Sequence, residues 1–441
     1  MKIILPDNVK RIIDVLVTEG FEAYAVGGCV RDSILGRIPD DWDITTSAKP
    51  YEVKQFFKRT VDTGIQHGTI TVLIEKESYE VTTYRIDGEY EDSRHPKEVT
   101  FTSNLVEDLK RRDFTINAMA YNDKEGIIDC FQGIADIRDR KIRCVGNPEE
   151  RFLEDALRIM RAIRFSAQLD YDMEEKTKEA VKKLSPSLSR ISAERIQVEL
   201  VKLVTSPHPG KMRDLYETGI TKIIMPEFDE AMKTTQNHPH HKYTVGEHTI
   251  HAMEEIKADK VLRFTMLFHD FGKPRTKQVD ENGIEHFHGH EEVSEEMART
   301  ILQRLKFDND TISKVTMLVR VHDWKVNNTR KGVRQALSKI GEDLFPLFLL
   351  VKKADTLAQS EFLRKEKLEE LVTLEHLFQE VINNKECISL KMLAVSGNDL
   401  IEMGMEPGKE IGKALKSLLE IVIDDPTQNR KDILLQKLLE L

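Results

Sequence analysis

The sequence contains little cysteine and no long apolar run. The four cysteines among its 441 residues lie far apart and form no Cys-x-x-Cys pair. This spacing argues against a disulfide framework or a thiol-rich zinc site, and it is typical of a reducing compartment. The most apolar segment, residues 344–351, is broken by Pro346 and is too short to span a bilayer. The first residues show no apolar stretch followed by a small-residue cleavage site, so we expect a cytoplasmic protein without a membrane partner.

The sequence also lacks an excess of positive charge. It has 66 Lys and Arg residues against 76 Asp and Glu residues, which gives a formal net charge of -10 at pH 7. This balance argues against a surface coated for non-specific nucleic-acid binding, although it allows a local basic groove. Hydrophobic residues make up 40% of the chain, which is enough for sizeable cores, and the length predicts two to four domains.

Secondary-structure signals change between residues 143 and 147. Before this point strand-like segments alternate with helices, and beyond it apolar residues recur almost entirely at helical spacing, for example over residues 152–169. The expected fold class is therefore α+β, with a small mixed-sheet head followed by a long all-α body. The expected strands cover residues 23–26, 41–46, 69–75, 79–85 and 99–102, and the expected domains cover residues 1–143, 144–225, 226–350 and 351–441.

Two aspartates in the head indicate a metal site. Asp41 and Asp43 are two residues apart, so a strand would place both carboxylates on one face. Neighbouring carboxylates repel each other unless a cation lies between them, and Mg²⁺ held by carboxylates and substrate phosphates is the usual solution. An isolated Asp-x-Asp is more often an acidic turn, so this pattern needs support from its surroundings.

That support comes from the residues just before the aspartates. Gly27 and Gly28 lie between a strand-like and a helix-like segment, and Arg31 follows them. Glycines let backbone N–H groups approach a phosphate, and a helix N-terminus favours negative charge. Together with the aspartates, this string indicates a nucleotide site. As a third carboxylate we favour Glu80 over Asp62, although Glu80 could equally be a solvent-facing strand residue.

A third pattern suggests how a nucleobase could be selected without a template. Asp155 and Arg158 are three residues apart, so on a helix they share one face. They would offer an acceptor beside a group of donors, which matches the amino group and ring nitrogen of cytosine and of adenine. Uracil and guanine present the opposite pattern, and each mismatched buried group costs about 1–3 kcal/mol. By itself this pair could also be an ordinary surface ion pair.

These motifs resemble class II tRNA nucleotidyltransferases of the DNA polymerase beta superfamily. The matching strings are GGCVRDSILG followed by Asp-x-Asp, then RRDFTINAMAY at 111–121, then EDALRIMRAIRF at 154–165. The resemblance implies that the protein adds CCA to the 3′ end of tRNA from CTP and ATP, with Mg²⁺ in the head and no DNA partner. It assigns the catalytic metals to Asp41 and Asp43, phosphate and ribose contacts to Arg111 and Asp113, base reading to Asp155 and Arg158, and further nucleotide contacts to Gly28, Arg31 and Arg161.

Residues 85–96 bear on the subclass. This segment is rich in Gly, Pro and charge and predicts a loop. It resembles the flexible loop of members that add the complete CCA, so the resemblance implies full CCA synthesis. An enzyme that adds only A is one alternative. A bacterial poly(A) polymerase is another, although that enzyme is expected to have a strongly basic tail, whereas this tail is mixed in charge.

The body carries a second pattern of possible metal ligands. Imidazoles combined with carboxylates suit a divalent metal. The pattern of one His, an adjacent His-Asp pair and a distant Asp resembles HD-family phosphohydrolases. That resemblance implies a divalent metal, of unpredicted identity, held by His248, His269, Asp270 and Asp323, with His290, His322 and His288 available for a second metal or a phosphate. The implied substrates are 2′,3′-cyclic or other terminal phosphates.

Two further hypotheses remain open from the sequence. The chain could be a non-catalytic RNA-binding protein with an inactive head, although such a protein has no reason to concentrate carboxylates where phosphates must approach. The HD pattern could instead carry the main activity, with a head that only senses nucleotides. In the tail, Lys409, Lys413 and Lys416 form either a modest phosphate-binding strip or a solvated helix face. The sequence does not predict an oligomeric state.

Overall fold

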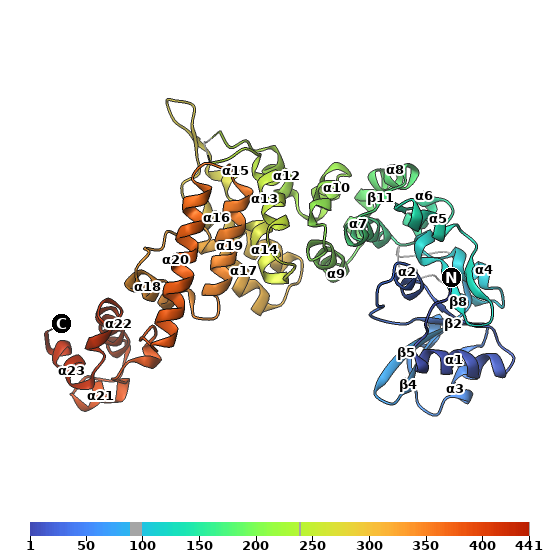
Figure 1. Ribbon diagram of the computed structural model, residues 1–441, viewed down its shortest axis with the longest axis horizontal. Helices are drawn as coiled ribbons and strands as arrows, with labels where there is room; N and C mark the ends of the chain where they lie inside the picture. The colour runs from blue at the N-terminus through green and yellow to red at the C-terminus, as the bar shows by residue number, and fades with distance from the viewer. Residues whose placement is uncertain (89–98, 238–239, 441) are drawn as a thin grey trace. The chain divides into compact units, whose positions relative to one another are not determined.

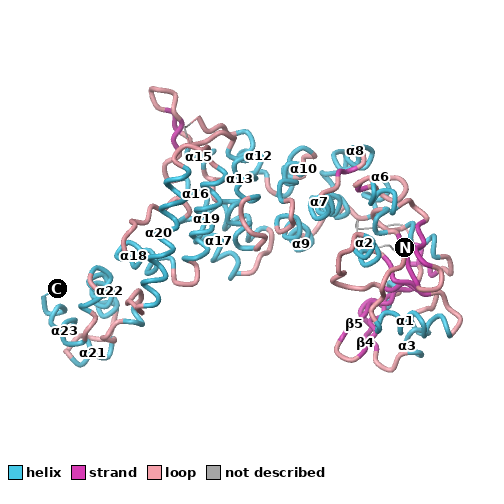
Figure 2. The backbone as a smooth tube through the Cα atoms, viewed as in Figure 1, coloured by secondary structure: helices cyan, strands magenta, loops and turns pink. Residues whose placement is uncertain are grey.

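The computed structural model describes residues 1–88, 99–237 and 240–440 (Figure 1). Most of the loop predicted over residues 85–96 therefore lies outside the described residues. The chain forms two compact units, residues 1–226 and 227–441. All described strands of the head's large sheet lie in the first unit, and the second unit is almost entirely helical (Figure 2). The α+β prediction is confirmed.

The head is built on a seven-stranded mixed sheet. Its strand order is β3-β4-β5-β2-β1-β8-β9, and the β2–β5 pair is parallel whereas the other neighbours are antiparallel. The central strands β1 and β2 are buried along their whole length, as expected for strands covered on both faces. The strands are β1 (Ala23–Val26), β2 (Ile44–Thr46), β3 (Thr60–Gly64), β4 (Thr69–Ile74), β5 (Glu77–Thr83), β8 (Met119–Asn122) and β9 (Gly126–Asp129).

Short helices pack around this sheet. Helix α1 buries Val9, Ile12, Ile13 and Leu16, whose spacing of three to four residues forms one apolar face, and it packs against β1. A separate hairpin pairs β6 (Arg85–Asp87) with β7 (Val99–Phe101). The head helices are α1 (Asp7–Thr18), α2 (Gly28–Ile34), α3 (Pro50–Phe56), α4 (Leu105–Lys110) and α5 (Gly133–Arg138).

The rest of the first unit is helical, with one break that the periodicity did not predict. Residues 152–169 do not form one helix, because α6 ends at Glu154 and Asp155 is extended, with φ −140° and ψ 103°. The Asp155 carboxylate accepts a hydrogen bond from the backbone N–H of Leu157 at 3.0 Å, a local bond that competes with helix formation. The helices here are α6 (Pro148–Glu154), α7 (Leu157–Leu169), α8 (Glu175–Leu184), α9 (Ala193–Val204), α10 (Met212–Glu217) and α11 (Thr221–Ile224).

The second unit is a helical array whose apolar clusters include two that lie wholly within its described residues. One cluster joins α18, α19 and α20, and the other holds the last helices together. No helix among the described residues is long and apolar enough to cross a membrane. The helices are α12 (Pro226–Lys233), α13 (Val245–Glu254), α14 (Lys260–Phe268), α15 (Lys273–Thr276), α16 (His290–Arg304), α17 (Asn309–Val321), α18 (Arg330–Ile340), α19 (Phe345–Ala358), α20 (Arg364–Asn383), α21 (Gly397–Glu402), α22 (Lys409–Asp424) and α23 (Lys431–Glu440).

Candidate active sites

The two head aspartates lie just before β2 rather than within it. The prediction of a strand over residues 41–46 is therefore too long, since β2 begins at Ile44. The backbone still follows the sheet at this point, because the carbonyl of Asp43 accepts a hydrogen bond from the N–H of Val26 at 2.9 Å. Asp41 and Asp43 are both exposed, so their carboxylates stand at the end of a buried strand where a nucleotide can reach them.

The sheet register brings a third carboxylate to these aspartates. In the parallel pair of β2 and β5, Ile44 lies opposite Val81, so the residues one position earlier, Asp43 and Glu80, come side by side. Partial removal from water raises the pKa of Asp43 to about 6, and the charges of Asp41 and Glu80 raise it further against the opposing charge of Arg112. Asp62, the weaker alternative, instead forms an ion pair with Lys54 at 2.9 Å.

The predicted phosphate loop is closely packed. Gly27 has φ +87°, and a Cβ there would lie 3.1 Å from Nη1 of Arg112, so glycine suits both the backbone and the space. Gly28 begins α2. Arg31 is buried and donates to Oδ1 of Asn117 at 2.7 Å and to both carboxylate oxygens of Asp32. These bonds give Arg31 a role in fixing α2 against the head.

Asp113 is a buried, fully oriented acceptor. One oxygen accepts from the N–H of Phe114 at 2.9 Å and from the side chain of Asn117, and the other accepts from Nε and Nη2 of Arg161 at 2.7 and 2.6 Å. Burial alone would raise its pKa, but the charges of Arg161 and Arg158 lower the pKa of Asp113 to about 2. Asp113 and Arg161, two of the predicted nucleotide residues, therefore contact each other.

Arg111 and Arg112 are held by a neighbouring buried carboxylate. Arg111 donates to Oδ1 of Asp108 at 2.9 Å, and Nη2 of Arg112 lies 3.7 Å from Oδ2 of the same residue. Asp108 is fully buried, and the two guanidinium groups keep its pKa below the ordinary value despite the cost of burial. Asp108 thus holds the guanidinium of Arg112, whose charge acts on Asp43.

The base-reading pair is arranged differently from the expectation. Asp155 and Arg158 do not share one continuous helix, because the chain breaks at Asp155. Asp155 accepts from Nη2 of Arg195 on α9 at 2.7 Å, whereas Arg158 donates to Glu154 at 2.6 Å and to the carbonyl of Arg111 at 3.0 Å. Each side chain is therefore oriented by its own partner. Sequence reasoning missed Arg195, since an ion pair that spans 40 residues leaves no signal in local spacing.

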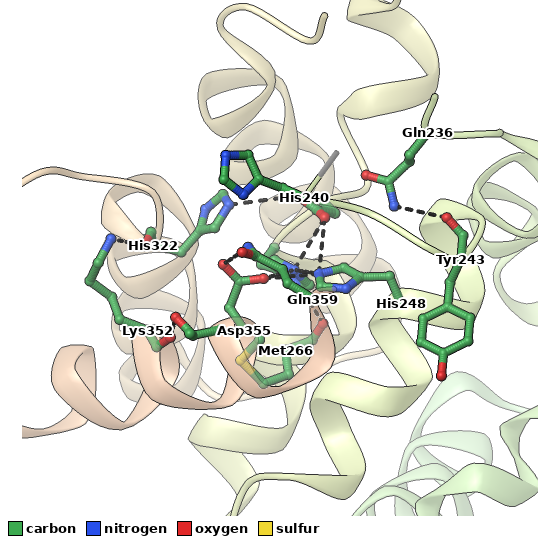
Figure 3. Close-up of polar contacts among 12 residues, drawn as sticks. Gln236, His240, Tyr243, His248, Met266, His322, Lys352, Asp355 and Gln359 are labelled. Carbon is green, nitrogen blue, oxygen red and sulfur yellow. Dashed lines mark hydrogen bonds and ion pairs between the residues drawn. The ribbon is translucent and has the colours of Figure 1, made fainter. Parts of the chain in front are cut away.

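The second unit gathers four histidines and two aspartates at one place, namely His248, His269, His290, His322, Asp270 and Asp355. Figure 3 shows His248, His322 and Asp355 of this group. The prediction chose Asp323 as the distant carboxylate, but the structure corrects this, because Asp323 is exposed. Asp355 of α19 takes the position, with Oδ1 2.9 Å from Nε2 of His248 and 3.7 Å from Nε2 of His269. Gln359 donates to the other oxygen of Asp355 at 3.0 Å and so fixes its orientation.

Asp270 lies between two sets of histidines. Its Oδ2 is 3.5 Å from Nε2 of His248 and 3.2 Å from that of His269, and its Oδ1 is 3.4 Å from Nε2 of His290 and 3.6 Å from that of His322. Both oxygens are buried without a regular hydrogen bond within the described part of the chain, although the ammonium of Lys273 lies 2.7 Å away. Two triads of possible metal ligands thus share one carboxylate.

Backbone contacts fix which nitrogen three of the four imidazoles present. A carbonyl can only accept, so a ring whose Nδ1 bonds a carbonyl carries its proton there and, when neutral, presents a lone pair at Nε2. These Nε2 atoms face each other in pairs, at 3.2 Å between His248 and His269 and at 3.2 Å between His290 and His322. The Nδ1 bonds run from His269 to Met266 O (2.7 Å), from His290 to Phe287 O (2.8 Å) and from His322 to Val319 O (2.7 Å).

The cluster therefore suits a divalent cation. Asp270 is buried and Asp355 is half-buried. Burial raises the pKa of both carboxyls, but the neighbouring histidines hold each pKa well below the ordinary value, and Lys273 adds to this effect at Asp270. In the His290–His322 pair, the facing lone pairs of two neutral rings repel unless a proton or a metal lies between them. Nitrogen together with carboxylate oxygen is a donor set typical of Zn²⁺, Mn²⁺ and Fe²⁺. His288 is exposed and stacks on His286, so it lies outside both triads.

The whole chain is similar to curated proteins of one kind. It is 37% identical over 434 residues to a CCA-adding enzyme of Levilactobacillus brevis, which covers 98% of this chain and 97% of that protein. It is 36% identical over 436 residues to a CCA-adding enzyme of Enterococcus faecalis, which covers 98% and 96%. The chain belongs to the CCA-adding enzyme family. This membership confirms the resemblance to class II tRNA nucleotidyltransferases.

Further comparisons agree with the CCA-adding enzyme family. The crystal structure of the Bacillus stearothermophilus CCA-adding enzyme in complex with CTP is 29% identical, has a TM-score of 0.75 and covers 99% of this chain and 98% of that one. Family profiles match the Poly A polymerase head domain over residues 23–143, the "Probable RNA and SrmB- binding site of polymerase A" over residues 170–232 and domain 2 of tRNA nucleotidyltransferases over residues 279–438.

Proposed function

We propose that this protein completes the 3′ CCA end of tRNA from CTP and ATP, without a nucleic-acid template. The observation that carries the proposal is the convergence of Asp41, Asp43 and Glu80 at the open end of β2 and β5. The sequence similarity to CCA-adding enzymes along nearly the whole chain supports the choice of substrates. We assign residues 1–143 to the nucleotidyltransferase head, 144–225 to a base-reading neck, 226–350 to the HD region and 351–441 to the tail.

The reaction is an in-line displacement at the α-phosphorus of the nucleotide. The 3′-hydroxyl oxygen of tRNA forms the new bond to phosphorus, its proton is lost to solvent, and pyrophosphate leaves. Asp41 and Asp43, with Glu80, would hold Mg²⁺, which would neutralise the triphosphate and lower the pKa of the attacking hydroxyl. Arg111 would bind phosphate oxygens. Asp113 would accept a hydrogen bond from the ribose in place of one of its present donors, because Phe114, Asn117 and Arg161 already use both of its oxygens.

Base choice would depend on Asp155 and Arg158. Asp155 is ready to accept from the amino group of cytosine or adenine, and Arg158 can donate to the adjacent ring nitrogen. Uracil and guanine place a carbonyl and an N–H at these positions, so each would leave two polar groups unpaired. Gly28, Arg31 and Arg161 would then support the site by fixing α2 and the Asp113 carboxylate rather than by reading the base.

Extension of tRNA transcripts tests this proposal. Transcripts that end before CCA, after the first C, or after both C residues are incubated with Mg²⁺ and single nucleoside triphosphates. We expect extension to CCA and a stop there, loss of all extension in Asp43→Asn, and unchanged extension in the matched control Asp62→Asn. Addition of A only after CC would indicate the A-adding alternative, and long A tails would indicate a poly(A) polymerase. No extension of any end would refute the proposal.

We also propose a metal-dependent phosphohydrolase activity for the second unit. Its support is the carboxylate of Asp270 between two histidine pairs, an arrangement that can hold two divalent ions. His248, His269, Asp270 and Asp355 would hold one ion, and His290 and His322 with Asp270 the other. Such a site suits hydrolysis of a 2′,3′-cyclic or other terminal phosphate, which would restore a hydroxyl for the head to extend.

The hydrolase proposal is tested separately from the transferase. The full chain is loaded with Mn²⁺, Fe²⁺ or Zn²⁺ and given a 2′,3′-cyclic nucleotide or a 3′-phosphorylated RNA. We expect release of a monoester or of phosphate that disappears in Asp270→Asn and persists in Asp43→Asn. Equal rates in wild type and Asp270→Asn would contradict this second activity without affecting the first.

A further inference from the structure

Helix α9 carries two charged side chains toward the proposed nucleotide residues. Arg195 and Glu199 are four positions apart, so they lie one above the other on one face of the helix. Arg195 binds Asp155, and Glu199 accepts from Nε of Arg164 at 2.8 Å and lies 3.9 Å from Nη1 of Arg161. One face of α9 thus contacts Asp155, the predicted base contact, and Arg161, which binds the predicted ribose contact Asp113.

The contact with Arg195 matters because the backbone does not fix Asp155 as a helix would. Asp155 is extended at the break between α6 and α7. Its Oδ1 is anchored by the N–H of Leu157 at 3.0 Å and its Oδ2 by Nη2 of Arg195 at 2.7 Å, so both oxygens are oriented. Each carboxylate oxygen can accept two hydrogen bonds, and each therefore keeps one lone pair for a base. The side chain of Asp155 is 19% exposed and that of Arg195 is 21% exposed, which leaves the pair accessible to a nucleotide.

We propose that Arg195 is the positioning residue for nucleobase selection, because it holds Asp155 where only an amino group meets the carboxylate. The proposal rests on the base-reading role assigned to Asp155 above. A carboxylate held by a single anchor can rotate and accept from the ring N–H of uracil or guanine instead. Arg195 does not touch the base in this proposal. It restricts the acceptor to one position, and the difference between cytosine and uracil depends on that position.

Relative rates with CTP and UTP test the proposal. The ratio of kcat/KM for CTP to that for UTP is measured on tRNA that lacks CCA, for wild type, Arg195→Gln, Arg195→Lys and Asp155→Ala. We expect Arg195→Gln to lower the ratio about tenfold, mainly through a higher KM for CTP and a gain in UTP use, since hydrogen bonds to charged groups contribute at this level. Arg195→Lys keeps the charge and is expected to recover part of the ratio.

The matched control is Lys202→Gln, which removes a positive charge from an exposed position of the same helix. It is expected to behave as wild type. An unchanged ratio in Arg195→Gln, or an equal loss of rate for CTP and UTP together with a lower melting temperature, would overturn the positioning role. If Arg195→Gln does not fold, Arg195→Met, which also removes the charge, is measured in its place, and a wild-type ratio in Arg195→Met while Asp155→Ala loses discrimination would overturn the positioning role. Full discrimination in Asp155→Ala would instead refute the base-reading role itself.

Discussion

Asp355 and His248 are separated by 107 positions in the chain, yet Oδ1 of one lies 2.9 Å from Nε2 of the other. The contact joins α19 to α13 (Figure 3). It brings Asp355 to the cluster around Asp270, since His248 also lies 3.5 Å from Asp270. Asp355 also accepts a hydrogen bond from Gln359. Its Oδ1 therefore faces the histidines, whereas its Oδ2 is bonded within α19. The identity of the distant carboxylate is the point at which structure and sequence disagree most clearly, and it can be tested directly.

We expect Asp355→Asn to weaken divalent-metal binding by the second unit. Loss of a charged ligand removes both a donor oxygen and the negative charge that favours the cation, and even outer-shell changes weaken metal affinity about 10–100-fold. Metal content after dialysis and titration with Mn²⁺ measure the effect. Asp323→Asn is the control, because that carboxylate is exposed, and it should leave the affinity unchanged. The reverse result would restore Asp323 as the ligand.

In the head, we expect Glu80→Gln to reduce nucleotidyl transfer by about a hundredfold or more, comparable with loss of a single electrostatic group in other active sites. Glu80 is exposed and stands next to Asp43 through the β2–β5 register, so the change should not destabilise the fold. Single-turnover rates of C addition with Mg²⁺ give the measurement. Asp62→Asn, which only breaks a surface ion pair with Lys54, should retain the wild-type rate. A Glu80 variant with full activity would reduce the site to two carboxylates.

Asp113 should make the stability of the first unit depend on pH in acid. Its folded pKa of about 2 lies below the ordinary value for an aspartate, so the folded state favours the ionised form and this contribution to stability is complete above the unfolded pKa. The contribution of Asp113 to the free energy of unfolding is about 2 kcal/mol, and it is lost as the pH falls from about 4 toward 2. The difference in unfolding free energy between wild type and Asp113→Asn should be constant near neutral pH and shrink over that window.

Asp139→Asn gives the comparison for this pH experiment. That carboxylate is 53% exposed and pairs with Arg138 on the surface, so its loss should leave the unfolding free energy nearly unchanged. If the Asp113 variant loses as little as this control at neutral pH, then the buried pair with Arg161 does not stabilise the fold.

Gly272 should tolerate no side chain. A Cβ at this position would lie 2.3 Å from the carbonyl oxygen of His290 and 2.8 Å from the backbone nitrogen of Ser294, so α16 would have to move. We expect Gly272→Ala to destabilise the protein by about 1–3 kcal/mol and to lower metal occupancy by displacing His290. Thermal unfolding and metal content measure both effects. Gly412→Ala has open space on α22 and should raise stability slightly, by up to about 1 kcal/mol.

Local periodicity predicted much of the head, and the reasons for its failures are physical. The strand expected over residues 23–26 coincides with β1, because four consecutive apolar or aromatic residues in a buried strand leave a clear pattern. The helix expected over residues 152–169 is broken because the side chain of Asp155 bonds to the backbone, a choice that spacing does not reveal. Alternation alone also extended the strand of residues 41–46 across two aspartates that lie before it.

In the histidine cluster, the sequence could not predict which aspartate would contact His248. His322 at the end of α17 points inward, and consecutive helical positions differ by about 100° in direction, so its neighbour Asp323 points outward. Asp355 had a usable signal, since it is an acidic residue within the apolar helix α19. Which of these carboxylates meets His248 depends on how α19 packs against α13 and α14, and that information is not local.

Three imidazoles of the cluster are tied by Nδ1 to a carbonyl three residues earlier in their own chain segment. The same local device, used at His269, His290 and His322, sets each ring before any ligand arrives. The cost in side-chain entropy of ordering these rings is therefore met when the chain folds and not when a metal binds. Capture of the ion then requires little more than exchange of its water molecules, and the backbone of the second unit should be nearly superimposable with and without it.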